Sequence, residues 1–130
     1  AAGIVIGAGL GDSARAALMT RGYAEMTRLA LGLGAKAETL AGLSGFGDLV
    51  LTCTSEQSRN FRYGQALGAK QGFDPHVTVE GAATAKAVSN MAKSLQIDMP
   101  ITSMIAAVID HHITLPQAIQ ALLSRPLKQE

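Results

Sequence analysis

Apolar residues recur along this chain at spacings of three and four, which is the periodicity of helices that bury one side. The clearest such segment covers about residues 12–33 and predicts a long helix. Its apolar stripe comprises Met19, Tyr23, Met26, Ala30 and Leu33. Arg21, Glu25 and Arg28 stand at neighbouring positions on the same helix, where we expect them to form charge pairs.

The rest of the chain shows the same periodicity in shorter segments, separated by turn-forming residues, and each segment predicts a further helix. Pro100 opens one helix, and Thr114 with Gln117 is a start signal for the last, which we expect to end before Pro126. The other helices are expected over residues 37–43, 49–53, 55–69 and 81–95. We therefore predict one all-α domain over residues 1–130, a bundle of six to seven helices.

The first residues contain a competing pattern. An apolar run at residues 4–6 precedes Gly7 and Gly9, which is similar to a dinucleotide-binding unit, where a strand leads into G-x-G-x-x-G and a helix. The third glycine of that motif falls at Asp12, whose carboxylate would repel a pyrophosphate. No second apolar strand with a terminal acidic residue follows about 20 residues later. We therefore expect a flexible, glycine-rich lead-in to the first helix.

Composition narrows the class of protein. The 130 residues carry a net charge of +1 with 16% charged residues, and they lack the basic stripe that nucleic-acid binding needs. A single cysteine allows no internal disulfide, so a reducing cytoplasm is expected. No apolar run is long enough for membrane insertion. Because the chain does not begin with methionine, we expect it to be part of a longer protein.

Residues 45–60 are the strongest candidate for a site. The run is largely apolar yet includes Asp48, whose burial would require polar partners. It ends in the triplet Ser58, Arg59 and Asn60. A hydroxyl, a planar guanidinium and an amide are together well suited to hold a phosphate monoester. The triplet therefore predicts a small-molecule site.

Plainer interpretations compete for several of these residues. Asp48 follows Gly47 and is well placed to cap a helix, and Arg59 is within sequence reach of a surface ion pair with Glu56. Cys53 lies in an apolar run without a nearby histidine, so we expect an inert core thiol. The three histidines show no metal-ligand spacing, so no metal site is predicted.

Five motifs occur in an order that resembles one family. They are residues 11–22 (GDSARAALMTRG), residues 45–55 (GFGDLVLTCTS), Ser58-Arg59-Asn60, Val79-Glu80-Gly81 and residues 121–126 (ALLSRP). Together they resemble the carboxy-terminal helical domain of the bacterial NAD(P)-dependent glycerol-3-phosphate dehydrogenases, over essentially the whole chain. The resemblance implies the substrate domain of a 6-phosphogluconate-dehydrogenase-like oxidoreductase.

The resemblance also implies a reaction. The whole enzyme of this family reduces dihydroxyacetone phosphate to sn-glycerol 3-phosphate with NADH or NADPH, for glycerophospholipid synthesis. An amino-terminal Rossmann domain holds NAD or NADP, and a catalytic lysine stands just before the helical domain, upstream of Ala1 here. We therefore expect no catalytic residue in this chain and no turnover by the chain alone. Relatives further suggest a homodimer.

The substrate residues carry over by motif. Asp48 matches an active-site aspartate beside that lysine and the substrate hydroxyl. Ser58, Arg59 and Asn60 match the triplet that contacts glycerol 3-phosphate. The resemblance therefore assigns all four residues to substrate binding.

The cofactor residues carry over less completely. Arg59 is expected to reach the nicotinamide cofactor, and Thr78 and Glu80 match a segment that touches it from the helical side. The family usually has valine at the position of Thr78, which a backbone contact would tolerate better than a side-chain contact. Two other functions stay open: the helical domain of a related hydroxy-acid dehydrogenase, or a helical interaction module without catalysis.

Overall fold

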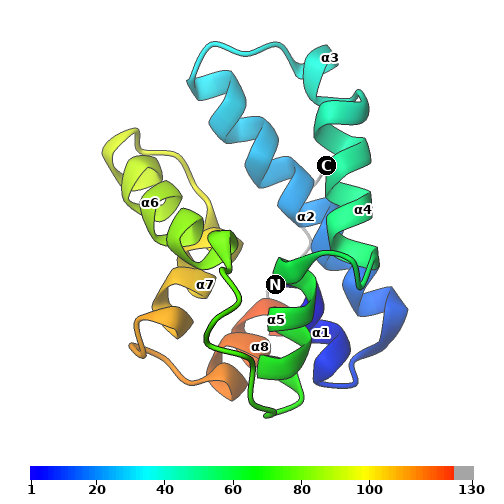
Figure 1. Ribbon diagram of the computed structural model, residues 1–130. Coiled ribbons are helices and arrows are strands. Elements are labelled where there is room, and N and C mark those ends of the chain that lie inside the picture. Colours follow the sequence, from blue (N-terminus) through cyan, green and yellow to red (C-terminus); the bar gives the residue numbers. More distant parts are fainter. Residues whose placement is uncertain (125–130) are drawn as a thin grey trace.

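The computed structural model describes residues 1–124, and this part of the chain forms helices joined by short turns, without strands (Figure 1). The elements are α1 (Ala2–Gly7), α2 (Gly11–Gly32), α3 (Ala37–Leu40), the π-helical turn η1 (Leu43–Gly47), α4 (Asp48–Thr54), α5 (Arg59–Gly68), α6 (Glu80–Ser94), α7 (Pro100–Ile109) and α8 (Leu115–Ser124). The all-α prediction is therefore confirmed, although residues 1–124 form eight α-helices and one π-helical turn where six to seven helices were expected. No helix among these residues is long and apolar enough to cross a membrane.

The core lies where α1, α2, α7 and α8 meet. Val5, Leu18, Ile101 and Leu122 contribute one side chain from each of these helices, and each is at most 8% exposed. These helices come from both ends of the described chain, so the core holds the two ends together. Of the elements between them, α3 to α6, helix α5 packs directly on α1 and buries Phe61, which is 4% exposed (Figure 1).

The predicted helix starts in the second half are confirmed. Pro100 is the first residue of α7, where its missing N–H costs nothing. Before α8, the Thr114 N–H donates to Gln117 Oε1 at 2.9 Å and the Gln117 N–H donates to Thr114 Oγ1 at 3.4 Å, a reciprocal capping box. The expected stop at Pro126 lies outside the described residues.

The prediction of a flexible lead-in at residues 1–11 is wrong. This segment forms the buried helix α1, in which Ile4 and Val5 are each 5% exposed. The similarity to a dinucleotide-binding strand also fails here, because the apolar run is helical. The glycines of α1 do not form a nucleotide-binding loop; they lie where α1 packs against α5.

Glycines on α1 and α5 let the two backbones touch. A Cβ on Gly3 would lie 2.1 Å from the Phe61 carbonyl oxygen, and one on Gly68 would lie 2.3 Å from the Ile4 carbonyl oxygen. Both separations are too short for a carbon atom, so only glycine permits this crossing. The crossing fixes the start of the chain beside the first turn of α5.

The prediction that Glu25 forms charge pairs with Arg21 and Arg28 is wrong, because Glu25 is 2% exposed and binds another helix. Its carboxylate accepts hydrogen bonds from the Ile101 N–H at 2.6 Å and from the N–H and hydroxyl of Thr102, both at 3.1 Å. Arg21 and Arg28 donate to backbone carbonyls of α8 and of the segment before α7. These three side chains therefore connect α2 to α7, to α8 and to the segment between α6 and α7.

The predicted apolar stripe of α2 is only partly correct. Leu18, which is not in the stripe, is 8% exposed, whereas Leu33, which is in it, is 60% exposed. The reason is visible in Figure 1, where α2 extends well beyond the core helices, so its far end has few neighbours to cover it.

Candidate functional site

A cavity of about 290 Å³ lies between the end of α4 and the starts of α5 and α6. It is lined by Leu51, Thr52, Ser55, Gln57, Ser58, Arg59, Asn60, Thr78 and Glu80. Five of the six residues predicted for the site are therefore brought together, although they come from segments about 20 positions apart. The sixth, Asp48, does not line this cavity.

The start of α5 forms one wall of the cavity. Ser58 is the N-cap, and its Oγ accepts a hydrogen bond from the Phe61 N–H at 3.2 Å. Arg59 and Asn60 occupy the first two positions of the helix, whose N–H groups have no carbonyl partner within the helix. The helix macrodipole and the guanidinium both favour an anion here.

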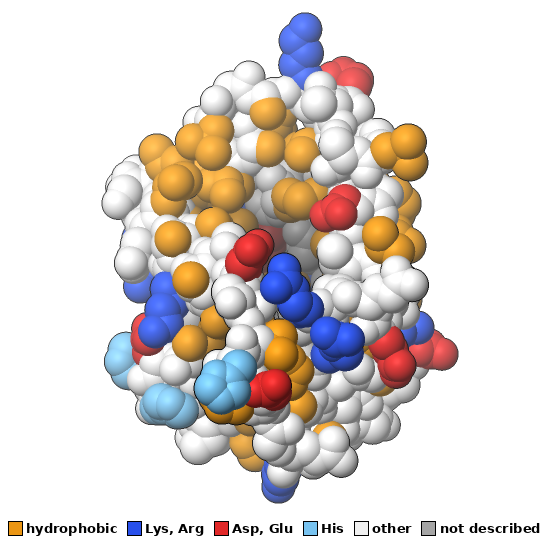
Figure 2. Space-filling model, viewed as in Figure 1, with side chains coloured by type: hydrophobic (Ala, Val, Ile, Leu, Met, Phe, Trp, Pro, Cys, Tyr) orange, Lys and Arg blue, Asp and Glu red, His pale blue; other side chains and the backbone are white. Residues whose placement is uncertain are grey.

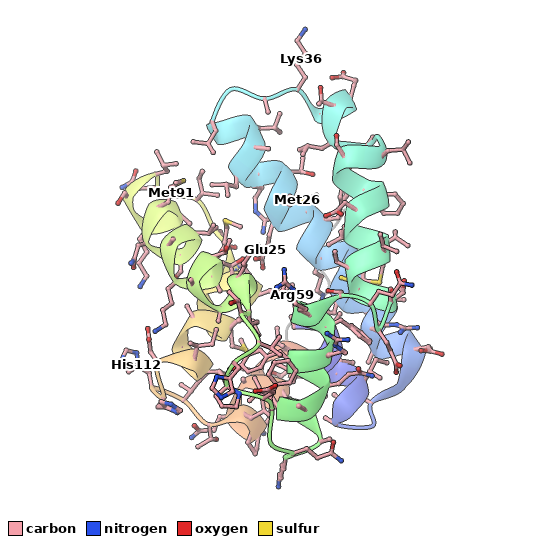
Figure 3. All side chains as sticks on the ribbon, in the orientation of Figure 1. Glu25, Met26, Lys36, Arg59, Met91 and His112 are labelled. Carbon is pink, nitrogen blue, oxygen red and sulfur yellow. The ribbon has the colours of Figure 1, made fainter. Side chains whose placement is uncertain are left out.

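Arg59 is exposed, and within residues 1–124 it forms no ion pair with Glu56. The alternative of a surface ion pair is therefore wrong. Figure 3 shows Arg59 at the start of α5, near the middle of the face in view. Its guanidinium is available to a ligand in the cavity.

The start of α6 forms the opposite wall. Glu80 is the first residue of this helix, which confirms its prediction as a first-turn acid. Thr78 and Glu80 are both exposed and both line the cavity. Asn60 joins the two walls, because its Oδ1 accepts a hydrogen bond from the Gly81 N–H at 2.9 Å.

Several hydrogen-bond donors in the cavity lining are available to a ligand, beside the carboxylate of Glu80. Three side-chain oxygens in its lining already accept a backbone N–H: Ser55 Oγ from Gln57 at 3.1 Å, Ser58 Oγ from Phe61, and Asn60 Oδ1 from Gly81. The two hydroxyl protons, the Asn60 amide and the Arg59 guanidinium are left to donate. Such a set suits the acceptor oxygens of a phosphate.

The predictions that Asp48 is buried or caps a helix are both wrong. It is exposed, it is the first residue of α4, and its side chain does not cap that helix. The preceding Gly47 already has helical dihedral angles, φ −61° and ψ −46°, because η1 runs directly into α4. Without a break in the helix there is no cap position, so the side chain is free to extend outward.

Four lining residues were not predicted: Leu51, Thr52, Ser55 and Gln57. All four lie within residues 45–60, so their closeness in sequence to Ser58, Arg59 and Asn60 could have indicated that they line the site. The packing of α4 on α5 decides which side chains of α4 and of the following turn face the cavity. Sequence spacing does not show this packing. Leu51, which is 58% exposed, adds an apolar wall to a polar site.

Within residues 1–124, neither the Cys53 thiol nor the potential metal ligands form a second reactive site. Burial raises the pKa of the Cys53 thiol above its usual range, which keeps it protonated and unreactive at neutral pH. Among residues 1–124, no group of three or more His, Cys, Asp or Glu side chains is arranged to hold a metal ion.

The wider surroundings of the site are shown in Figure 2. A hollow opens in the middle of this face, with charged side chains of both signs along its lower edge and apolar patches beside it. Leu51 of α4 and Met91 of α6 are 58% and 44% exposed, and Leu95, which follows α6, is 43% exposed. Apolar groups gathered around a hollow are typical of a surface that binds another component.

The fold is that of a domain found in a dehydrogenase of known structure. The structure matches part of the crystal structure of glycerol-3-phosphate dehydrogenase from Coxiella burnetii with a TM-score of 0.88 and 44% sequence identity, over 95% of this chain and 40% of that one.

Sequence comparison specifies the family. The profile described as NAD-dependent glycerol-3-phosphate dehydrogenase C-terminus matches residues 1–120, and the chain belongs to this family. It is 75% identical over its full length to glycerol-3-phosphate dehydrogenase [NAD(P)+] of Cereibacter sphaeroides and 61% identical to that of Paracoccus denitrificans. It spans 43% and 41% of their lengths. The resemblance found in the sequence motifs is therefore confirmed.

Proposed function

We propose that this chain is the carboxy-terminal, substrate-binding domain, over residues 1–130, of an oxidoreductase that reduces dihydroxyacetone phosphate to sn-glycerol 3-phosphate with NAD(P)H, for glycerophospholipid synthesis. The observation that carries the proposal is the guanidinium of Arg59 at the start of α5, which forms no ion pair within residues 1–124 and lines a cavity together with other hydrogen-bond donors. Family membership and the named relatives support the same reaction.

The domain contributes binding and orientation. Arg59, the Ser58 hydroxyl and the Asn60 amide hold the phosphate, with the free N–H groups of α5 beneath it. The apolar side chain of Leu51 lies beside the three-carbon chain of the substrate. Anchoring one end of so small a molecule restricts where its carbonyl carbon lies, which lowers the entropy cost of reaction.

The cofactor and the catalytic lysine belong to an upstream Rossmann domain. Reduced NAD or NADP supplies the hydride when bound there. In this chain, the Glu80 carboxylate, the Thr78 hydroxyl and Arg59 at the rim of the cavity fit contacts with the cofactor's polar groups. The upstream segment would enter beside the site, because the Gly3 backbone touches the Phe61 carbonyl in the first turn of α5.

We propose that Asp48 orients the catalytic lysine of the upstream domain. It lies one helix turn before Leu51 and Thr52, which line the cavity, and its side chain is exposed. A lysine arriving from the upstream domain would pair with this carboxylate and be oriented by it. We also propose a cytoplasmic homodimer for the whole protein.

The test is replacement of Arg59 in the full-length enzyme. Arg59→Ala should raise KM for dihydroxyacetone phosphate about 10-fold to 100-fold, the effect of losing charge-assisted hydrogen bonds. Arg59→Lys should recover only part of the loss, since lysine lacks the planar fork. Arg62→Ala is the matched control, because Arg62 is exposed on the same helix but does not line the cavity.

Two results would contradict the proposal. If Arg59→Ala leaves kcat/KM for dihydroxyacetone phosphate unchanged, the chain is better described as an interaction module. If the full-length enzyme oxidises hydroxy acids but does not reduce dihydroxyacetone phosphate, it is a related hydroxy-acid dehydrogenase.

A further inference from the structure

The hydrogen bond between Asn60 and Gly81 connects the two walls of the cavity. Asn60 lies in the first turn of α5 and Gly81 in the first turn of α6, and 21 positions separate them in the chain. Arg59 and Glu80, their immediate neighbours, both line the cavity. The bond therefore sets the spacing between the two helix starts that carry the site.

This bond also determines the orientation of the Asn60 amide. The Gly81 N–H can only donate, so the atom that faces it must be the oxygen Oδ1. The nitrogen Nδ2, which can only donate, is then the part of the amide left for a ligand. The reverse orientation would place two donors against each other and present an acceptor to the phosphate.

Glycine at position 81 gives the amide room to take this position. A Cβ on Gly81 would lie 2.7 Å from Asn60 Oδ1, 2.9 Å from Cγ and 3.3 Å from Nδ2. The atoms it would strike are the end of a flexible side chain, and no backbone atom is among them. An added methyl group would therefore displace the Asn60 amide and leave the fold in place.

We propose that Gly81 is a positioning residue for the substrate, which acts by holding the Asn60 amide with its Nδ2 directed to the phosphate. This inference deepens the proposed function and rests on it. It assigns a role to Gly81 that is separate from any backbone flexibility, since its backbone is helical within α6.

The first experiment is Gly81→Ala in the full-length enzyme. We expect KM for dihydroxyacetone phosphate to rise about 10-fold, and the inhibition constant of inorganic phosphate to rise in parallel, with little change in KM for NADH. The midpoint of thermal unfolding should stay the same or increase, because alanine favours a helix over glycine. Gly72→Ala is the control, since a Cβ there meets no atom within 4 Å.

The second experiment is Asn60→Asp, which separates the bond to Gly81 from the donor. The carboxylate can still accept from the Gly81 N–H, but it presents an oxygen to the phosphate in place of Nδ2. We expect a larger rise in KM for dihydroxyacetone phosphate than in Gly81→Ala, and a partial recovery at lower pH as the carboxylate is protonated.

The outcomes distinguish this inference from the function it rests on. If Asn60→Asp raises KM but Gly81→Ala does not, the positioning role of Gly81 is overturned and the phosphate site stands. If Gly81→Ala lowers thermal stability and changes kcat without KM, Gly81 has only a structural role. If neither variant nor Arg59→Ala changes KM, the phosphate site itself is wrong.

Discussion

Glu25 belongs to α2 but takes the place of an N-cap for α7. The residue at the N-cap position of α7 is Met99, whose side chain makes no capping hydrogen bond. The Glu25 carboxylate satisfies two N–H groups and one hydroxyl at that helix start. Its negative charge also lies at the positive end of the helix macrodipole, which offsets part of the cost of burial.

We predict that Glu25→Gln lowers the free energy of unfolding by about 2 kcal/mol, because it removes the charge and turns an NH₂ group toward donors. Urea unfolding followed by circular dichroism measures the change. Glu38→Gln, at an exposed first-turn position of α3, is the control and should change little. Equal urea midpoints for the two variants would show that the Glu25 contact adds no stability.

At the scale of elements, the crossing of α1 and α5 links the core to the site. Val5 of α1 lies in the core, while Arg59 at the start of α5 lines the cavity. Gly64 is also in the crossing, where a Cβ would lie 3.0 Å from the Ile4 nitrogen. Because backbones are in contact, this crossing has little freedom to adjust to a larger residue.

We expect Gly68→Ala to lower the free energy of unfolding by about 2 kcal/mol or more, since the added carbon must push α5 away from α1. Gly22→Ala should instead raise it by up to about 1 kcal/mol, because a Cβ in the middle of α2 meets no atom within 4 Å. Both are measured by urea unfolding. If both substitutions changed the free energy of unfolding by a similar amount, helix propensity alone would explain both changes.

At the scale of the whole molecule, the proposed function gives the described chain the substrate end of a site whose cofactor would be held by a second component. Its cavity holds donors for an anion, and residues 1–124 contain no strand on which a dinucleotide-binding unit could be built. The exposed apolar side chains beside the hollow in Figure 2 fit a covering domain. Activity is therefore expected only when that domain is present.

We predict that the 130-residue chain alone does not oxidise NADH in the presence of dihydroxyacetone phosphate, whereas the full-length enzyme does. The rate of NADH consumption measures both, and circular dichroism confirms that the chain is helical in the assay. Turnover by the helical chain at a rate comparable to that of the full-length enzyme would disprove the need for an upstream domain.

Much of the fold could be predicted from sequence because it depends on local signals. Apolar periodicity identified α2, α6 and α7, and the start signals at Pro100 and Thr114 identified where two helices begin. Ser58, Arg59 and Asn60 could be grouped for a similar reason. Adjacent residues at one helix start are close in space however the helix packs, so their shared cavity did not depend on tertiary contacts.

The tertiary structure alone decided which side chains became buried and which distant residues met. Sequence spacing predicted a charge pair for Glu25, but the start of α7 packs against it, and it predicted a helix cap for Asp48, but η1 continues into α4 without a break. Asn60 and Gly81 met only when α5 and α6 came together. Periodicity shows that a helix has an apolar side, but burial and long-range hydrogen bonds depend on where the neighbouring helices lie, and spacing along the chain does not contain that information.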